Sequence, residues 1–264
     1  MKPARFDYAA PATVDETLGL LDDDATVLAG GQSLVPLLNL RLAQPALVVD
    51  IGGVAELDYI RAEDGALRIG ATTRQAALER SQLARDDWPL LHKAVRLVGH
   101  PQIRTRGTVG GSVAHADPAA ELPVALTALG ARFHLASRRG VRSLGAAELF
   151  LGPLYTSREP DELLVEIEVP AQPDGSASGF AEHARTHGDF ATAGAAAVVA
   201  PGRAGIALLG AAPVPVRAEA AERALAAGAA PHEAAELAAA DIDDDYRRAL
   251  CTELARRAIA EATP

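Results

Sequence analysis

The sequence predicts a mixed protein of the α+β class that is divided into three parts. In residues 1–54, a short apolar run, a glycine loop and an amphipathic run follow one another, as in a strand–loop–helix unit. In residues 55–170, strand-like and helix-like runs alternate, and from residue 171 three strand-like runs precede an alanine-rich helical tail. A chain of 264 residues is long enough to bury a sizeable core across these parts.

The first part is expected to contain two helices and two strands. The helices are expected over residues 14–21 and from Leu34 to about Ala43, and the strands over residues 25–28 and 46–51. Thr13 and Ser33 precede the two helices and are expected to cap them. Pro36 falls in a first helical turn, where its missing N–H costs nothing, and the glycine pair at 52–53 predicts a turn.

The second and third parts follow from the same periodicities. In the second part, strands are expected over residues 66–69, 132–136 and 163–169, and helices over residues 72–79, 88–98 and 118–129, with a short helical segment at Ser112. In the third part, residues 180–187, 193–199 and 204–209 predict an antiparallel meander, followed by helices near 217–227, 231–240 and 245–262. Residues 170–179 form the turn-rich connection between these parts.

Two glycine loops are the most informative motifs. Residues 29–34 read Ala-Gly-Gly-Gln-Ser-Leu, and residues 108–112 read Thr-Val-Gly-Gly-Ser. Glycine lets backbone N–H groups approach an anion closely, and the start of a following helix favours negative charge. Two such loops about 80 residues apart suit one elongated ligand with phosphates in its middle. Each loop alone could equally be an ordinary turn, and neither matches the G-x-G-x-x-G or P-loop pattern.

Composition limits the classes of function. The formal net charge of −10 argues against nucleic acid as a partner, because binding to phosphates requires a basic surface. Cys251 is the only cysteine, so an internal disulfide and an all-cysteine iron–sulfur cluster are excluded, and any such cluster must belong to a partner. The chain shows no long apolar span and no signal-peptide core, so we expect a cytoplasmic protein without an integral membrane segment.

The residues that could carry chemistry remain open to several interpretations. The seven histidines lack metal-site spacing, so no metal is expected, and the serines of the glycine loops lack the G-x-S-x-G context of a nucleophile. Asp117 and Glu121 could be a general acid and base pair, helix-terminal carboxylates, or acceptors of sugar hydroxyl groups. Arg104 and Arg106 could neutralise phosphate or simply lie in solvent.

Three segments, taken in order, resemble a known family. They are residues 29–34 followed by Leu-Arg-Leu-Ala-Gln-Pro at 40–45, residues 108–112 followed by Ala-His-Ala-Asp-Pro at 114–118, and Gly-Asp-Phe-Ala at 188–191. Together they resemble the FAD-binding medium subunit of molybdenum hydroxylases. The carbon monoxide dehydrogenase medium subunit is the nearest type, and the flavin domain of xanthine dehydrogenase is similar. The resemblance covers essentially the whole chain.

The resemblance implies a fold and a set of FAD-binding residues. The fold would be a two-subdomain FAD-binding fold of the vanillyl-alcohol-oxidase (PCMH) type, at residues 1–54 and 55–170, followed by a C-terminal flavoprotein domain of sheet and helices at 171–264. Backbone N–H groups of both glycine loops would hold the pyrophosphate. Asp117 and Glu121 would meet ribityl or ribose hydroxyl groups, Val98 would lie beside the flavin, and Leu163 near the adenine. The implied cofactor-binding residues are Leu28, Ala29, Gly30, Gly31, Gln32, Ser33, Leu34, Val98, Thr108, Val109, Gly110, Gly111, Ser112, Ala114, Asp117, Glu121 and Leu163.

The resemblance also implies partner subunits and one departure from the family pattern. A large subunit would carry the molybdenum cofactor and a small subunit two [2Fe–2S] clusters, in a heterotrimer that could itself dimerise. Electrons would pass from the iron–sulfur clusters to FAD and then to an external acceptor, with no catalytic side chain on this chain. Some relatives carry a lysine in the segment matching residues 180–184, where this chain has none, and His183 or Arg185 could substitute.

Two other functions remain as alternatives. A stand-alone FAD-dependent oxidase or reductase of the same fold would need its own substrate site, and His100 or His115 could then anchor the flavin covalently. A cofactor-free interaction module would use the glycine loops only as turns. Neither the substrate of the complex nor the terminal acceptor can be read from this chain.

Overall fold

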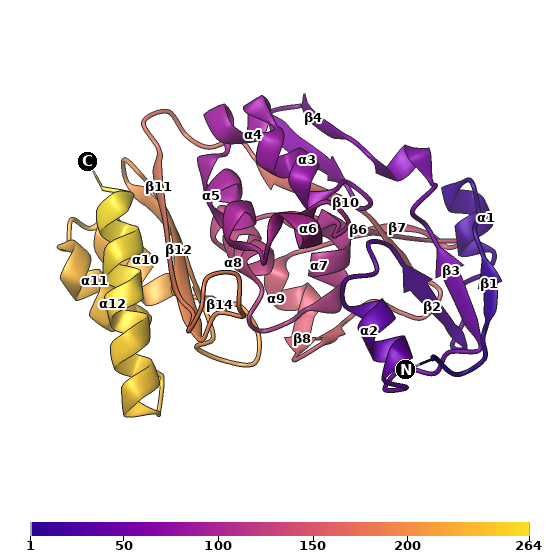
Figure 1. The fold of residues 1–264 in the computed structure, drawn as a ribbon. Coiled ribbons are helices and arrows are strands. Elements are labelled where there is room, and N and C mark those ends of the chain that lie inside the picture. The colour runs from indigo at the N-terminus through magenta and orange to yellow at the C-terminus, as the bar shows by residue number, and fades with distance from the viewer. Residues whose placement is uncertain (1, 264) are drawn as a thin grey trace.

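The computed structural model describes residues 2–263 and arranges them around three main sheets that follow one another along the molecule. Figure 1 shows the N-terminal sheet at the right, the middle sheet with its helices in the centre, and the C-terminal sheet and helices at the left. The chain is a mixture of helices and strands, as the sequence predicts.

The N-terminal sheet is parallel and has the order β1-β3-β2. Its elements are β1 (Asp7–Ala9), α1 (Val14–Leu18), β2 (Ala25–Leu28), α2 (Leu34–Asn39) and β3 (Leu47–Asp50). Because β2 and β3 pair in parallel, from Ala25 opposite Leu47 to Leu28 opposite Asp50, the chain must cross over between them. The glycine loop at 29–34 and α2 make this crossover, so the loop lies at the carboxyl end of β2.

The middle sheet has five strands in the antiparallel order β4-β5-β10-β6-β7. Its strands are β4 (Ile60–Glu63), β5 (Ala66–Gly70), β6 (Arg132–Ser137), β7 (Gly140–Leu144) and β10 (Leu163–Pro170). Between β5 and β6 the chain forms α3 (Gln75–Arg80), α4 (Gln82–Asp87), α5 (Pro89–Leu97), α6 (Pro101–Arg104), α7 (Val109–His115) and α8 (Glu121–Leu129). Four small elements complete this part: a 3-10 helix at Ala55–Leu57, α9 (Ala146–Leu149), β8 (Phe150–Gly152) and β9 (Tyr155–Thr156).

The C-terminal sheet lies between helices on both faces. Its strands are β11 (Ala177–His183), β12 (Ala193–Ala200), β13 (Arg203–Leu209) and β14 (Val216–Arg217), followed by α10 (Glu219–Ala226), α11 (Pro231–Ala238) and α12 (Asp245–Glu261). Glycine permits close packing on each face: a Cβ at Gly179 would lie 2.1 Å from the Ala258 carbonyl of α12, and one at Gly205 would lie 2.1 Å from the Ala128 carbonyl of α8.

The largest buried core joins the middle and C-terminal parts. It includes Phe133 and Ile167 of the middle sheet, Leu126 of α8, and Ala196 and Leu209 on the inner face of the C-terminal sheet. A second core fills the space between the C-terminal sheet and its helices, and a third links the N-terminal sheet to Leu163 at the start of β10. The division into units ending at residues 54 and 170 stays a prediction.

Several local expectations were wrong. Ser33 occupies the N-cap position of α2, but its backbone has helical angles (φ −102°, ψ −49°) and its hydroxyl caps nothing, whereas Thr13 accepts the Glu16 N–H of α1 as expected. The helix α2 ends at Asn39, short of Ala43, and α3 begins at Gln75 rather than at residue 72. The strand expected over residues 180–187 runs from Ala177 to His183, so His187 lies in the loop that follows.

Candidate functional site

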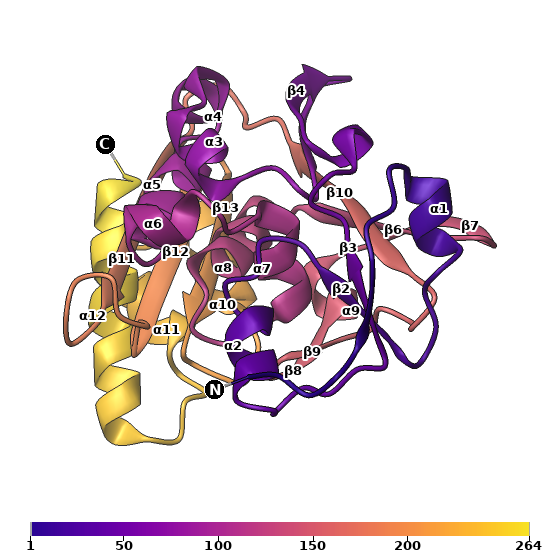
Figure 2. The same ribbon diagram turned by 45° about the vertical axis from the view of Figure 1, so that its right-hand side comes forward.

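The two glycine loops meet in space. A Cβ at Gly30 would lie 2.5 Å from the Arg106 carbonyl oxygen and 2.8 Å from Gly107 Cα, so only glycine allows this approach of two backbones. A Cβ at Gly111 would lie 3.8 Å from the Ala29 side chain. Figures 1 and 2 both place α7, which begins in the second loop, beside α2, which begins in the first. The fold thus brings together two segments about 80 residues apart.

A cavity of about 650 Å³ opens between these loops. One part of the lining is formed by Thr26 and Val27 of β2 and by Ile51 directly after β3, together with Arg158, Leu163 and Leu164. Val27 and Ile51 share a core with Leu163. Another part is formed by Val98, Gly99, His100 and Ile103, together with Gly188, Asp189 and Phe190. This volume and this mixture of apolar walls with a few polar groups are typical of a site for a large organic cofactor.

The cavity takes in most of the residues that the resemblance implies. All of them line it except Leu28 and Val109. Val109 is fully buried in the central core, and the Leu28 carbonyl accepts the Ile51 N–H within the N-terminal sheet. The contact of each lining residue with a cofactor stays a prediction.

The two loops differ in the backbone donors that they leave open. In the second loop the amides are in use: Gly110 donates to the Ala71 carbonyl at 3.0 Å and Gly111 to Thr108 Oγ1 at 3.0 Å, and those of residues 109 and 112 are also bonded. In the first loop the amides of residues 30–34 have no acceptor among residues 2–263. An anion in this cavity would therefore find its backbone donors in the first loop. The second loop, whose amides are bonded within the chain, would instead provide a rigid backbone wall without side chains.

Three carboxylates gather where α8 begins. Glu121 is the first residue of α8 and is buried, and Asp117 and Glu182 of β11 are the acidic groups that act on it. Burial, assisted by these two like charges, raises the pKa of Glu121 to about 8, and burial raises that of Glu182 to about 7. The Glu182 Oε2 atom is buried without a hydrogen-bond partner among the described residues. Asp117 Oδ1 accepts the Ala119 N–H at 2.8 Å, but no arginine or lysine among the described residues forms a salt bridge with any of the three carboxylates.

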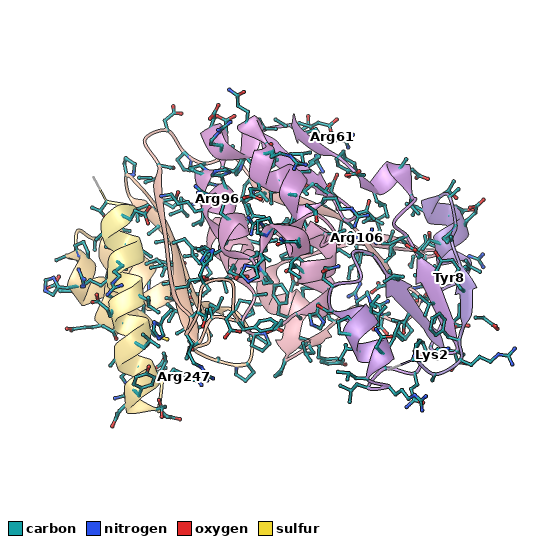
Figure 3. All side chains as sticks on the ribbon, viewed as in Figure 1. Lys2, Tyr8, Arg61, Arg96, Arg106 and Arg247 are labelled. Atoms are coloured by element: carbon teal, nitrogen blue, oxygen red, sulfur yellow. The ribbon has the colours of Figure 1, made fainter. Side chains whose placement is uncertain are left out.

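Arg104 is neither a phosphate ligand nor a solvated residue. It is buried and forms a bidentate pair with Glu79, at 2.8 and 2.9 Å, and donates to the Val98 and Gly99 carbonyls at 3.0 and 3.3 Å. Arg104 thus fixes the backbone of two residues that line the cavity. Arg106, labelled in Figure 3, is exposed, and its carbonyl oxygen contacts Gly30 and accepts a hydrogen bond from Arg74.

The loop after β11 forms part of the cavity mouth. Gly188 has φ +81°, and a Cβ there would lie 2.4 Å from His100 Cε1, so the loop packs tightly on the turn before α6. The rings of His100 and His187 contact each other edge to face, with centroids 6.2 Å apart. Phe190 also lines the cavity and is 71% exposed. The Gly-Asp-Phe-Ala motif of the sequence thus lies at the cavity, although sequence reasoning gave it no role beyond resemblance.

Other lining residues were missed by sequence reasoning. They include Leu37, Ala71, Gln75, Gly107, Ala119, Ala120 and Leu164, which follow no motif. Arg158 was missed as well, and no local pattern distinguishes it from the other arginines. The only sequence signal for Gly107 is that it directly precedes the second glycine loop.

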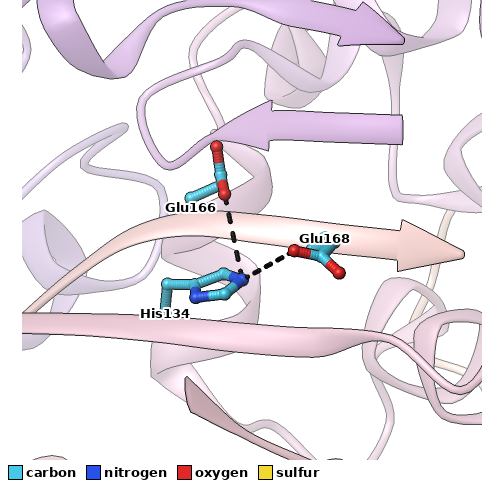
Figure 4. Close-up of side chains that lie close together, drawn as sticks. All are labelled: His134, Glu166 and Glu168. Carbon is cyan, nitrogen blue, oxygen red and sulfur yellow. Dashed lines mark hydrogen bonds and ion pairs between the residues drawn. The ribbon is translucent and has the colours of Figure 1, made fainter. Parts of the chain in front are cut away.

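A second polar cluster is formed by His134, Glu166 and Glu168 (Figure 4), which alternate along their strands with the buried Phe133, Leu135 and Ile167 and so face away from the core. His134 Nε2 lies 3.2 Å from Glu168 and 3.8 Å from Glu166, a grouping of donors that could in principle hold a metal ion. However, Arg68 Nη1 lies 2.7 Å from Glu166 and 3.1 Å from Glu168, and the Tyr59 hydroxyl donates to Glu166 at 2.7 Å. The cluster therefore carries its own cation.

The chain is similar to known FAD-binding subunits. Residues 4–172 match the family described as "FAD binding domain in molybdopterin dehydrogenase". The 6-hydroxypseudooxynicotine dehydrogenase complex subunit alpha of Paenarthrobacter nicotinovorans is 48% identical over 202 residues, covering 75% of this chain and 68% of that protein. The carbon monoxide dehydrogenase medium chain of Hydrogenophaga pseudoflava is 38% identical over 283 aligned residues, covering 99% and 98% of the two chains.

The fold agrees with these matches. A solved structure of carbon monoxide dehydrogenase from Hydrogenophaga pseudoflava superposes with a TM-score of 0.93 at 40% identity, covering 99% of this chain and 98% of that one. Within residues 2–263, none of the helices is both long and apolar enough for a membrane span.

Proposed function

Because this chain belongs to the family of FAD-binding domains in molybdopterin dehydrogenases, we propose that it carries electrons from the [2Fe–2S] clusters of a partner subunit to an external acceptor. The chain is an FAD-binding medium subunit of the molybdenum hydroxylase type and thus an oxidoreductase component. In the proposed complex, a large subunit holds the molybdenum cofactor and a small subunit holds the clusters. A cytoplasmic location is part of the same proposal and fits the buried, unpaired Cys251.

The observation that carries the proposal is the meeting of the two glycine loops around one cavity. The Gly30 backbone approaches the Arg106 and Gly107 backbone so closely that no side chain fits between them. The unpaired amides of residues 30–34 supply the donors that a diphosphate requires, and they lie on the wall of an elongated cavity.

The roles of the chain's own residues are binding and orientation. We assign anion binding to the amides of the first loop, hydroxyl recognition to Asp117 and Glu121, and apolar contact to Val98 and Leu163. FAD, when bound, supplies the redox chemistry, and the protein sets its position and electrostatic surroundings. None of these roles requires a side chain that gains or loses a proton during electron transfer.

A titration of the purified chain with FAD tests this proposal. Wild-type protein should be yellow, and denaturation should release the flavin because no covalent link is expected. Gly30→Ala should weaken FAD binding by more than about tenfold, because the new Cβ would displace one of the two backbones. Gly53→Ala is the matched control, since a Cβ there meets nothing within 4 Å, and its FAD affinity should stay within about twofold.

The partner assignment needs a separate experiment. Co-expression with candidate molybdenum and cysteine-rich subunits should yield a complex in which substrate reduces the bound flavin. A colourless chain that takes up no added FAD would refute the cofactor assignment. Turnover of an organic substrate by the isolated chain would instead support the stand-alone oxidase, for which His100 and His115 are present at the cavity as potential covalent anchors.

A further inference from the structure

The cavity is lined by more acidic than permanently cationic side chains, although its proposed ligand is an anion. Asp117, Glu121 and Asp189 are acidic, and Arg158 is the one permanently charged cation in the described lining. A dinucleotide brings two phosphate charges into this space. Open amides of the first loop can accept part of that charge, but a guanidinium is the stronger partner, because charge-assisted hydrogen bonds are about twice as strong as neutral ones.

Arg158 is held in place by its own segment. Its Nη1 atom donates to three backbone carbonyls, of Glu162 at 2.7 Å, Glu159 at 3.0 Å and Pro160 at 3.3 Å. Its Nε and Nη2 atoms have no acceptor among residues 2–263 and are not sealed from solvent. The Nη1 atom is thus fixed to the backbone, Nε and Nη2 keep free donors, and the Arg158 residue lines the cavity.

The acidic neighbours of Arg158 are already engaged by other arginines. Arg142 forms a bidentate pair with the Glu162 carboxylate, at 2.6 and 2.7 Å, and Arg139 does the same with Asp161, at 2.7 and 3.0 Å. No carboxylate among the described residues forms a salt bridge with Arg158. Burial lowers the pKa of Arg158, and the more distant charges of Glu162 and Asp161 oppose this effect only in part.

The position of Arg158 selects one half of the dinucleotide. Arg158 donates to the carbonyl of Glu162, directly before Leu163, and Leu163 packs with Ile51 in the N-terminal core, so Arg158 lies on this side of the cavity. Ile51, Leu163 and Leu164 are each less than 5% exposed. Another part of the lining includes Phe190, which is 71% exposed and stands at the mouth. A redox ring that exchanges electrons with partners must be near the mouth, so the enclosed side is left for the adenosine half.

We propose that Arg158 is a cofactor-binding residue that contacts the adenosine monophosphate half of FAD, through the free Nε and Nη2 donors. This inference rests on the proposed function, because it takes FAD as the ligand of the cavity. It predicts that Arg158 contributes to the affinity for FAD and ADP, and that it leaves the affinity for FMN, which lacks this half, unchanged.

The experiment compares three ligands on the full chain prepared free of flavin. Titrations with FAD, ADP and FMN are performed on wild-type protein, Arg158→Gln, Arg158→Lys and the control Arg247→Gln. Arg247 also donates to a backbone carbonyl, that of Gly210 at 3.1 Å, but lies in the C-terminal helix (Figure 3). Thermal unfolding of each ligand-free variant reports whether the fold is intact.

We expect the Arg158 variants to lose affinity for FAD and ADP but to keep their affinity for FMN. Arg158→Gln should weaken FAD and ADP binding by about tenfold to a hundredfold, while FMN binding stays within about threefold. Arg158→Lys should fall between wild type and Arg158→Gln, because lysine keeps the charge but not the fixed pair of donors. The Arg247→Gln control should bind all three ligands as wild type does.

Two results would overturn the inference while the proposed function stands. FAD binding by Arg158→Gln within about threefold of wild type would show that the guanidinium makes no contact with FAD that matters for binding. An equal loss of FAD and FMN affinity would place the contact on the flavin half or make it indirect. If Arg158→Gln does not fold, the same comparison is decided on Arg158→Lys. Failure of wild-type protein to bind FAD would instead refute the proposed function itself.

Discussion

The carboxylates on the outer face of the middle sheet have a cationic partner within the described part of the chain, whereas those at the cavity have none there. Glu166 and Glu168 alternate with the buried Ile167 along β10, and Arg68 on the neighbouring strand binds both of them. Glu121 lines the cavity and is buried, Glu182 beside it is half-buried, and neither forms a salt bridge among the described residues; their pKa values rise to about 8 and about 7. The protein therefore completes one acidic cluster by itself and leaves the other open.

This difference shows where an external ligand belongs. A buried polar group without a partner costs stability, so it persists where something else completes it. The open groups at the cavity include the amides of residues 30–34, the Glu121 carboxyl, the Gln75 Oε1 atom and the Arg158 guanidinium. The sheet cluster holds a cation against both of its carboxylates, and its unpaired buried atom, Arg68 Nε, lies 3.7 Å from the Glu63 carboxylate. The cavity is therefore distinguished by several open donors and acceptors that line one space.

The largest effect on stability is expected at Arg104, which lies beside the cavity yet is fully paired. Arg104→Gln should lower the free energy of unfolding by about 3 kcal/mol, because it leaves Glu79 partly buried without its bidentate partner. Urea denaturation at neutral pH measures the loss. The double variant Glu79→Gln/Arg104→Gln should recover part of it, and additive losses in the double variant would contradict the pairing.

The next effect concerns Glu121 and depends on pH. Its pKa of about 8 in the folded chain lies above the ordinary value of 4.5, so the folded state keeps a proton that the unfolded state has lost. The stability that this provides is complete below the unfolded pKa and is lost as the pH rises through about 8. The free energy of unfolding of the flavin-free chain should therefore fall between pH 5 and pH 8, by at most about 1.4 kcal/mol per pH unit for this group.

Glu121→Gln should remove most of this slope, because glutamine stays neutral at every pH. Glu182 titrates in the same direction, so Glu182→Gln should remove a smaller share, and Asp117 is the other acidic group that acts on Glu121. Glu79 gives the opposite sign: Arg104 lowers its pKa, so its contribution is lost as the pH falls. A slope in Glu121→Gln equal to that of wild type would show that the carboxyl is not the titrating group.

The smallest effect on stability is expected at the cluster of Arg68, Glu166 and Glu168 on the middle sheet. Arg68→Gln should destabilise the chain by about 1 kcal/mol, because its side chain is 21% exposed and water replaces part of the lost interaction. FAD affinity should stay within about twofold, since the cluster does not line the cavity. A large loss of FAD binding in Arg68→Gln would contradict the conclusion that the sheet cluster is structural and only the cavity carboxylates belong to the cofactor site.

The sequence predicted the elements around the glycine loops well because their signals are local. Strand β2 ends where the first glycine loop begins, and the expected range of residues 25–28 is the observed one. The expected helix ends were less accurate where no capping chemistry marked them, as at Asn39 of α2. Short elements such as α6 and β8 were missed because three or four residues give no measurable periodicity.

The site was predictable where a residue belonged to a motif or, as for Val98 and Leu163, where the family resemblance implied it. Both glycine loops, Asp117 and Glu121 line the cavity as a resemblance-based interpretation would place them. Arg104 could not be assigned, because its partner Glu79 lies 25 residues away on another helix. Glu182 and Arg158 could not be assigned either. Glu182 lies on a distant strand and acts on Glu121, and Arg158 reaches the cavity from a separate loop. Whether a charged residue is structural or available to a ligand depends on whether another helix or strand supplies its partner, and residue type alone does not show this.

The most direct test of the central claim is hydrogen–deuterium exchange of the backbone with and without FAD. If the first glycine loop supplies the donors for the diphosphate, amides of residues 30–34 should become strongly protected when FAD binds. Those of residues 109–112, which are already bonded to Thr73, Ala71 and Thr108, should change little. Unchanged exchange at residues 30–34 in the presence of saturating FAD would contradict the account.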